Sequence, residues 1–333
     1  MWRGGGADAH AALPSVYHRL DLRIALPKHF QHHLTGLPEE LDPAWYSDTD
    51  EAFEVLSGCE VFWLRGMPRS RVAKLVRQAP ASLRWITTEV AGVEWLPLAE
   101  LSRRSIRVTN GAGLRAIPIS EYVLMAMLAQ MKNLPELVRA QDRSRWLGGP
   151  PGRGELYGSR MLVLGWGEIG RAIGARARAF NVEVTGVRRH PAGESGVIGD
   201  HEWRRRLGEF HWLVLALPLT PATRHVIGAE ELRSMRPDAR LVNIARGRLV
   251  DQAALELAVT EGWIAGAYLD VTDPEPLPRT SPLWKAPGVM ISPHSSWASE
   301  HGDERAAARF LENLERYLSG RDLISEVDLA RGY

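Results

Sequence analysis

The chain has 333 residues, of which 45% are hydrophobic and 24% are charged; this composition is typical of globular proteins and the length allows two domains. The 41 Lys and Arg residues nearly balance 40 Asp and Glu residues, leaving a net charge of +1, so no global field would attract nucleic acid or an anionic membrane. No apolar run approaches the roughly 20 residues of a membrane helix. Cys59 is the one cysteine, which excludes an internal disulfide and a cysteine-rich metal site and predicts a reducing, cytoplasmic compartment.

Residues 1–20 contain no sustained hydrophobic stretch, so we expect a flexible extension here and no signal peptide. From residue 21 onward, short apolar runs alternate with helical patterns. The expected strands are 22–27, 60–64, 83–89 and 106–110, and the expected helices are 50–59 and 70–80. This alternation predicts parallel strands joined by crossover helices.

A long apolar helix is expected over 119–141, followed by a Gly- and Pro-rich loop or boundary at 146–160. A second alternating series then begins. Its expected strands are 160–165, 182–187, 211–218, 239–245, 263–271 and 289–294, and its first helix is 168–180. Short Val, Leu and Ile runs of this kind suit strands that are buried on both faces. An amphipathic helix over 303–320 ends the series, and the sequence thus predicts an α/β protein with two doubly wound parallel sheets.

The stretch GWGEIG contains Gly165, Gly167 and Gly170 in the spacing G-x-G-x-x-G, directly after an expected strand and at the start of an expected helix. In dinucleotide-binding folds the first glycine makes the turn, the second lets backbone approach the pyrophosphate, and the third lets helix and strand pack closely. We therefore predict a cofactor loop that includes Glu168 and Ile169. The alternative is a glycine-rich turn without a ligand, which the flanking strand and helix disfavour.

The next expected strand ends in Arg188 and Arg189. An NAD site carries an acidic residue at this place, which binds the ribose 2′-hydroxyl. An arginine would instead pair with a 2′-phosphate, so we predict that NADP(H) is preferred and that NAD(H) is possible. The alternative is a pair of solvated arginines at a surface strand end.

Three further strand ends carry the polar residues Arg246, Glu275 and His294. Ligands of doubly wound sheets lie beyond the carboxyl ends of the strands, so these side chains can converge there. Reduction of a 2-keto acid needs a proton donor and a cation that holds the carboxylate. We expect His294 to donate the proton, Glu275 to orient His294, and Arg246 to bind the substrate.

Taken singly, each of the three has a structural explanation. Arg246 could be an ordinary surface residue, Glu275 part of a Pro-rich turn, and His294 a hydrogen-bonded loop histidine. Their joint occurrence after the glycine loop favours catalysis.

With these motifs in place, the chain resembles the D-isomer-specific 2-hydroxyacid dehydrogenases, and within them the glyoxylate/hydroxypyruvate reductase-like members. The resemblance runs from about residue 22 to the end. It rests on GWGEIGRAIGARARAF, on the long stretch from LPLTPATRHVIG to VNIARGRLVDQAAL, and on AGAYLDVTDPEPLP and ISPH. Formate dehydrogenases look similar but carry an amide where Glu275 stands, which disfavours that branch.

The resemblance implies the catalytic roles given above for Arg246, Glu275 and His294. It also implies that the backbone at Ala91, Gly92 and Val93 contacts the substrate carboxylate. The further residues it implies at the cofactor are Leu217, Pro218, Thr223, Ile244, Ala245 and Asp270, of which Leu217, Pro218 and Asp270 lie on the nicotinamide side.

The domain layout implied is a Rossmann coenzyme domain, residues 115–295, inserted into a flavodoxin-like substrate domain formed by 21–114 and 296–333. A homodimer through the coenzyme domains is implied as well. Ser295, Ser296 and Trp297 depart from the small residues that often follow the histidine. We expect the indole of Trp297 to lie at the mouth of the substrate pocket.

Two other functions stay open from the sequence. One is a dinucleotide-sensing binding protein like the related corepressors, which act through partner surfaces. The other is an NAD-linked dehydrogenase of a bulkier 2-hydroxy acid. The leading prediction is an NADPH-linked reductase of small 2-keto acids that produces the D-hydroxy acid, with no metal.

Overall fold

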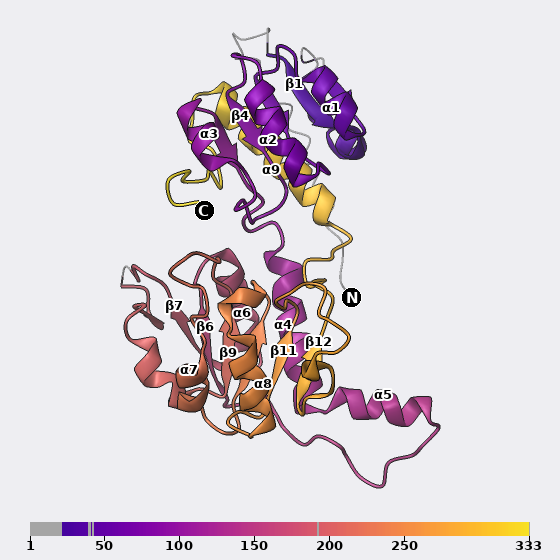
Figure 1. Ribbon diagram of the computed structural model, residues 1–333, viewed down its shortest axis with the longest axis vertical. Coiled ribbons are helices and arrows are strands. Elements are labelled where there is room, and N and C mark those ends of the chain that lie inside the picture. Colours follow the sequence, from indigo (N-terminus) through magenta and orange to yellow (C-terminus); the bar gives the residue numbers. More distant parts are fainter. Residues whose placement is uncertain (1–21, 39–40, 42, 192, 333) are drawn as a thin grey trace, which may run out of the picture. The chain divides into compact units, whose positions relative to one another are not determined.

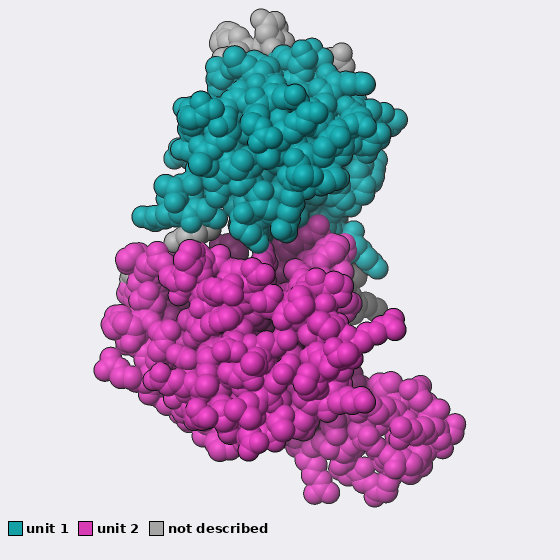
Figure 2. Space-filling model, viewed as in Figure 1, with its two compact units in different colours: residues 1–114, 300–333 teal, residues 115–299 magenta. Residues whose placement is uncertain are grey.

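The computed structural model describes residues 22–38, 41, 43–191 and 193–332, so the extension expected at 1–20 lies outside the described residues. Two compact units make up the described chain. Unit 1 comprises the residues up to Leu114 together with those from Glu300 onward, and unit 2 runs from Arg115 to Ser299 (Figure 2). In the part of the chain that the structure describes, no helix has the length and apolar character needed to cross a membrane.

Unit 1 is built around a five-stranded sheet with the order β2-β1-β3-β4-β5, and all pairings of neighbouring strands are parallel. This is the doubly wound order of flavodoxin-like folds. In chain order its elements are β1 Ile24–Pro27, η1 Lys28–His33, β2 Ala44–Tyr46, α1 Thr49–Val55, β3 Val61–Trp63, α2 Arg69–Gln78, β4 Trp85–Thr87, α3 Leu98–Arg103, β5 Arg107–Thr109 and, from the other end of the chain, α9 Gly302–Leu318 (Figure 1).

Both faces of this sheet are covered, because successive strand residues enter different cores. Trp63 of β3 packs with Phe30 and with Phe310 of α9, whereas its neighbour Phe62 packs with residues of α1 and α2. Side chains that alternate between two apolar cores explain why these strands read as continuous hydrophobic runs.

Unit 2 contains a seven-stranded parallel sheet with the order β12-β11-β10-β9-β6-β7-β8. Read from β6 outward, this is the Rossmann order with one added strand. In chain order its elements are α4 Ala116–Met131, α5 Leu134–Asp142, β6 Arg160–Leu164, α6 Glu168–Ala179, β7 Glu183–Val187, β8 Val197–Ile198, η2 Trp203–Glu209, β9 Trp212–Leu215, α7 Ala229–Ser234, β10 Arg240–Asn243, η3 Gly247–Leu249, α8 Gln252–Thr260, β11 Gly266–Leu269, η4 Pro282–Lys285 and β12 Val289–Ile291.

The two faces of the unit 2 sheet again have separate cores. Met161 and Val163 of β6 pack with residues of α4 and α6, while Leu162 and Leu164 pack with residues of α7 and α8. The prediction of two parallel α/β sheets is confirmed, and it follows that the carboxyl ends of β6, β7, β9, β10, β11 and β12 lie along one edge.

The prediction of one continuous helix over 119–141 is wrong. The segment is divided into α4 and α5 at Asn133, whose φ of 48° places it in the left-handed region. Pro135 stands in the first turn of α5, where a missing N–H costs nothing because that group has no partner within the helix. The division turns the chain, and α5 projects from unit 2 in Figure 1.

Candidate active site

The glycine loop joins β6 to α6 in the way the sequence predicts. Gly165 has a φ of +102°, and a Cβ there would come within 2.5 Å of the Ala216 carbonyl group. A Cβ on Gly170 would lie 2.2 Å from the Gly165 carbonyl oxygen. Glycine is therefore required at both places by close backbone packing.

Gly167 differs from its two neighbours in the motif. It is the N-cap of α6, and no heavy atom lies within 4 Å of the position its Cβ would take. Open space at a helix N-terminus, next to backbone N–H groups, is what a pyrophosphate needs. The cradle therefore fits a dinucleotide, with the exposed Glu168 and the partly buried Ile169 at its helical side.

The end of the neighbouring strand β7 carries the two arginines. Arg188 and Arg189 are both exposed, and β7 pairs with β6 along its length. Two cationic side chains thus lie one strand away from the glycine loop, on the side where a dinucleotide's adenosine ribose binds in doubly wound folds.

Other residues expected at the cofactor follow β9 and β10, on the opposite side of β6. Pro218 accepts a hydrogen bond from the Thr223 hydroxyl at 2.7 Å, which closes the turn after Leu217. Ile244 and Ala245 follow β10 directly. These positions share the carboxyl edge of the sheet with the glycine loop.

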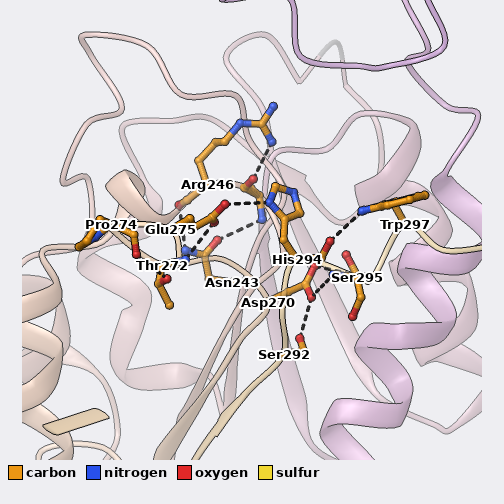
Figure 3. A network of polar contacts seen from close by, with 12 residues as sticks. Asn243, Arg246, Asp270, Thr272, Pro274, Glu275, Ser292, His294, Ser295 and Trp297 are labelled. Carbon is orange, nitrogen blue, oxygen red and sulfur yellow. Dashed lines mark hydrogen bonds and ion pairs between the residues drawn. The ribbon is translucent and has the colours of Figure 1, made fainter. Parts of the chain in front are cut away.

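Arg246 is placed by a buried asparagine. The Asn243 side chain accepts the Ala245 N–H at 3.1 Å and donates to the Arg246 carbonyl at 2.9 Å, so it shapes the turn from both sides. One guanidinium nitrogen, Nη1, donates to the Ala245 carbonyl at 2.7 Å. The backbone turn after β10 therefore fixes the start of the Arg246 side chain near the carboxyl end of that strand (Figure 3).

Glu275 and His294 are brought into direct contact. The Nδ1 atom of His294 lies 3.0 Å from Oε2 of Glu275, and the two side chains are 43% and 40% exposed (Figure 3). The other carboxylate oxygen of Glu275 accepts the Thr272 N–H at 3.1 Å. Because Nδ1 faces the carboxylate, Nε2 is the ring atom left to exchange a proton with a ligand.

Asp270 anchors the loop that carries His294, a role the sequence did not reveal. Its buried carboxylate accepts the Ser292 hydroxyl at 2.6 Å and the backbone N–H groups of Ser295 and Ser296 at 2.9 and 3.1 Å. Its carbonyl accepts the His294 N–H at 2.8 Å. These bonds hold His294 at a φ of 50°, a left-handed conformation that a non-glycine residue adopts only when its surroundings impose it.

Helix α4 and its N-cap residue Arg115 supply two more contacts to the same loop. The Tyr122 hydroxyl lies 3.1 Å from the Ser295 hydroxyl, and the Arg115 guanidinium lies 5.5 Å from the centre of the Trp297 ring. The indole N–H of Trp297 donates to the His294 carbonyl at 2.7 Å, and the side chain is 49% exposed. Arg115 and Tyr122 were not expected from the sequence, because α4 is remote from this loop along the chain. The contact of Trp297 with a substrate stays a prediction.

Ala91, Gly92 and Val93 belong to unit 1, where they follow β4. The Ala91 carbonyl accepts a hydrogen bond from the Asn110 side chain at 2.8 Å, and Val93 is buried. At the same edge of this sheet, Arg65 after β3 pairs with the buried Glu89 after β4 at 2.6 Å. The Arg65–Glu89 pair is a further polar group that the sequence analysis missed, since neither residue stands in a recognisable motif.

Residues 124–296 match the family described as D-isomer specific 2-hydroxyacid dehydrogenase, NAD binding domain. The chain is also similar to a glyoxylate reductase of Korarchaeum cryptofilum, with 32% identity over 257 residues, which cover 74% of this chain and 76% of the relative.

Two solved structures share the fold over most of their length. A D-isomer specific 2-hydroxyacid dehydrogenase family protein from Aeromonas salmonicida has a TM-score of 0.80 and 28% identity, covering 92% of this chain and 99% of its own. A D-isomer specific 2-hydroxyacid dehydrogenase from Xanthobacter autotrophicus was solved with NADPH and MES. It has a TM-score of 0.74 and 27% identity, covering 94% of this chain and 99% of its own. This chain therefore belongs to the D-isomer-specific 2-hydroxyacid dehydrogenase family, and it is an oxidoreductase that acts on a CH–OH group and binds a nicotinamide dinucleotide.

Proposed function

We propose that this protein is an NADPH-preferring reductase of small 2-keto acids of the glyoxylate or hydroxypyruvate type, which it converts to D-2-hydroxy acids. The observation that carries the proposal is the 3.0 Å contact between His294 and Glu275 at the sheet edge that also holds the glycine loop. A relative that is 32% identical is named glyoxylate reductase, which supports the substrate class.

In this proposal residues 115–295 form the cofactor domain, and 21–114 with 296–333 form the substrate domain. The glycine loop binds the pyrophosphate, and Leu217, Pro218 and Asp270 lie on the nicotinamide side. Thr223, Ile244 and Ala245 are further proposed cofactor contacts. When bound there, the nicotinamide ring supplies the hydride that reduces the keto carbon.

His294 is the proposed proton donor. Its Nε2–H protonates the oxygen of the keto group as the carbonyl becomes an alkoxide. Glu275 accepts a hydrogen bond from Nδ1–H and stabilises the charged ring before the proton leaves. With the Glu275 carboxylate fixed by the Thr272 N–H, the pair keeps the ring in one orientation.

Arg246 and the backbone N–H groups at Ala91, Gly92 and Val93 are proposed to bind the substrate carboxylate. A guanidinium can hold a carboxylate with two parallel hydrogen bonds, which also fixes the direction in which the neighbouring carbonyl points. The indole of Trp297 then limits the size of the group beyond the keto carbon. A small 2-keto acid carries the two groups that this proposal requires, a carboxylate and a neighbouring carbonyl.

Preference for NADPH is proposed from Arg188 and Arg189, which are exposed where an acidic residue would accept the ribose hydroxyl. The similar protein from Xanthobacter autotrophicus was solved with NADPH, which supports a 2′-phosphorylated cofactor. We place the enzyme in the cytoplasm, because its cysteine content suits a reducing compartment.

We also propose a homodimer through the cofactor domains. The projecting helix α5 exposes Leu134, Leu137 and Val138 by 40% to 48%, and Trp146 after it is 97% exposed (Figure 1). Apolar side chains gathered on a protruding helix mark an interaction surface. A second copy of this chain is the proposed partner.

The cofactor proposal is tested by replacing both arginines, Arg188→Ala and Arg189→Ala, and measuring kcat/KM with NADPH and NADH at a fixed glyoxylate concentration. The wild type should favour NADPH, and the double variant should lose about tenfold or more with NADPH while its value with NADH changes little. Arg205→Ala, at another exposed arginine of unit 2, is the matched control. Wild-type preference for NADH would overturn this part of the proposal.

A further inference from the structure

Trp166, the residue between the first two glycines of the loop, is buried at 4% exposure. Its indole lies over two further glycines, Gly174 of α6 and Gly186 of β7. A Cβ on Gly174 would come within 2.5 Å of the ring, and one on Gly186 within 2.3 Å. The ring therefore lies between α6 and β7, in a space that exists because residues 174 and 186 are glycines without side chains.

The polar end of this indole reaches the connection between β7 and β8. The Nε1–H group of Trp166 donates to Oε1 of Glu194 at 2.7 Å, across 28 positions of sequence. The second carboxylate oxygen of Glu194 accepts from Nη2 of Arg171 at 2.8 Å. Arg171 follows Gly170 in the first turn of α6, so Glu194 is bonded to one residue within the glycine loop and to the residue that directly follows the motif.

The connection that Glu194 belongs to begins with Arg188 and Arg189. Its ends are held by the sheet, since the Arg188 N–H donates to the Ile198 carbonyl at 3.2 Å and the Gly186 N–H to the Gly196 carbonyl at 2.9 Å. Glu194, near the β8 end of the connection, adds a third attachment through its contacts with Trp166 and Arg171. Three attachments thus limit the path of the backbone that carries the two arginines.

The charge of Glu194 matters for cofactor binding as well as its position. Hydrogen bonds from Arg171 and then Trp166 hold the pKa of Glu194 below its ordinary value, so this carboxylate stays ionised. Its ion pair is with Arg171, which balances the negative charge beside the adenosine end of the site. A carboxylate left uncompensated there would repel a 2′-phosphate.

We propose that Trp166, Glu194 and Arg171 form a brace between the glycine loop and the β7–β8 connection, and that this brace positions Arg188 and Arg189 for a ribose 2′-phosphate. Glu194 is then a specificity-determining residue, although its carboxylate does not contact the phosphate. The inference rests on the proposed preference for NADPH. It deepens that proposal, because it assigns discrimination between the two cofactors to residues beyond the two arginines.

The experiment compares two fragments of the cofactors, adenosine 2′,5′-bisphosphate and AMP, whose dissociation constants are measured by calorimetry on the full-length protein. It is combined with kcat/KM for NADPH and NADH. Glu194→Ala should weaken the 2′-phosphorylated fragment and lower kcat/KM with NADPH by about tenfold, the order that one charge-assisted contact contributes. Values for AMP and NADH should change far less. Glu183→Gln, at an exposed glutamate that begins β7, is the matched control and should match the wild type.

Trp166→Phe provides a second variant if Glu194→Ala does not fold, since it keeps an aromatic ring over Gly174 and Gly186 and removes the N–H donor. It should shift the ratio of the two fragments in the same direction. If the wild type prefers the 2′-phosphorylated fragment and both variants keep that preference, the brace is wrong and the cofactor proposal stands. Tighter binding of that fragment by Glu194→Ala would also overturn the brace, because it would show repulsion by Glu194. A wild type that prefers AMP would remove the cofactor proposal and the brace together.

Discussion

The His294 ring and the Glu275 carboxylate meet at 3.0 Å although 19 positions separate them in the sequence. Glu275 lies in the loop after β11 and His294 in the loop after β12, and these two strands are parallel neighbours. Two loops that leave adjacent parallel strands at the same edge must start close together. The fold itself therefore assembles the pair.

Removal of the imidazole should abolish most of the activity. His294→Ala is expected to lower kcat by about 100- to 10,000-fold, the range over which a positioned general acid contributes. The dissociation constant for NADPH should change little, since no predicted cofactor contact uses this ring. Steady-state kinetics and fluorescence titration measure the two quantities.

His301→Ala is the control for this prediction, because His301 is an exposed histidine that pairs with Glu304. It should retain wild-type turnover. An unchanged turnover number in His294→Ala would refute the acid role.

The negative charge of Glu275 should be required for full kcat, in addition to the hydrogen bonds that its side chain makes. In Glu275→Gln the amide can keep the contact with the Thr272 N–H, but it cannot stabilise a charged imidazole, so kcat should fall by about a hundredfold or more. Glu275→Asp should recover part of the loss. The dependence of kcat on pH is the decisive readout: an identical profile in Glu275→Gln and the wild type would show that Glu275 has only a structural role.

The exposed apolar face of α5 should be needed for association. Leu137→Asp places a charge on a residue that is 40% exposed, and we expect it to shift a dimer toward the monomer because a buried unpaired charge is costly. Light scattering after size exclusion measures the mass. The exposed Glu230 of α7 lies on another helix, and Glu230→Lys is the control. A monomeric wild type would contradict the dimer.

Acid should destabilise unit 2 through His211, which lies just before β9. Its Nδ1 accepts the Arg160 N–H at 3.0 Å, and burial, followed by the nearby Arg236, lowers the pKa of His211 from its ordinary value of 6.5. The unfolded chain therefore takes up this proton at higher pH than the folded one. The stability contributed by neutral His211 is complete above about pH 6.5 and is lost as the pH falls through the folded pKa.

His211→Asn tests this effect, because an amide oxygen can accept the same N–H and does not titrate. The decrease in Tm between neutral and mildly acidic pH should be smaller in His211→Asn than in the wild type. His201→Asn, at a histidine whose side chain is 76% exposed, should behave as the wild type does. Equal acid sensitivity in His211→Asn would contradict the assignment.

Much of the fold was predictable, because strands buried on both faces leave continuous apolar runs and the glycine spacing marks where the second sheet begins. Helix boundaries that depend on the backbone conformation of one residue were not predictable. The left-handed Asn133 splits an apolar helix whose pattern continues across it. The edge strands β2 and β8 have only three and two residues, and the polar, Gly and Pro residues that flank them leave no longer apolar run of the kind found around β3.

The candidate site divides in the same way. Arg246, Glu275 and His294 stand in motifs at strand ends, so topology alone indicates that they converge. Contacts that join distant segments leave no local signal. The anchoring of the His294 loop by Asp270 and the tie between Trp166 and Glu194 depend on the register of neighbouring strands and on glycines that open a slot for a ring.

The most direct test of the account is the loss of 340 nm absorbance with NADPH, and separately with NADH, against glyoxylate, hydroxypyruvate, pyruvate and phenylpyruvate. The account predicts the highest kcat/KM with NADPH and either glyoxylate or hydroxypyruvate. Hydroxypyruvate also reports the stereochemistry, since its product is chiral whereas that of glyoxylate is not, and chiral chromatography should show D-glycerate. Preference for phenylpyruvate or for NADH would contradict the substrate or the cofactor assignment, and L-glycerate would contradict the stereochemistry. Tight NADPH binding without turnover of any of the four acids would contradict the proposed reductase activity.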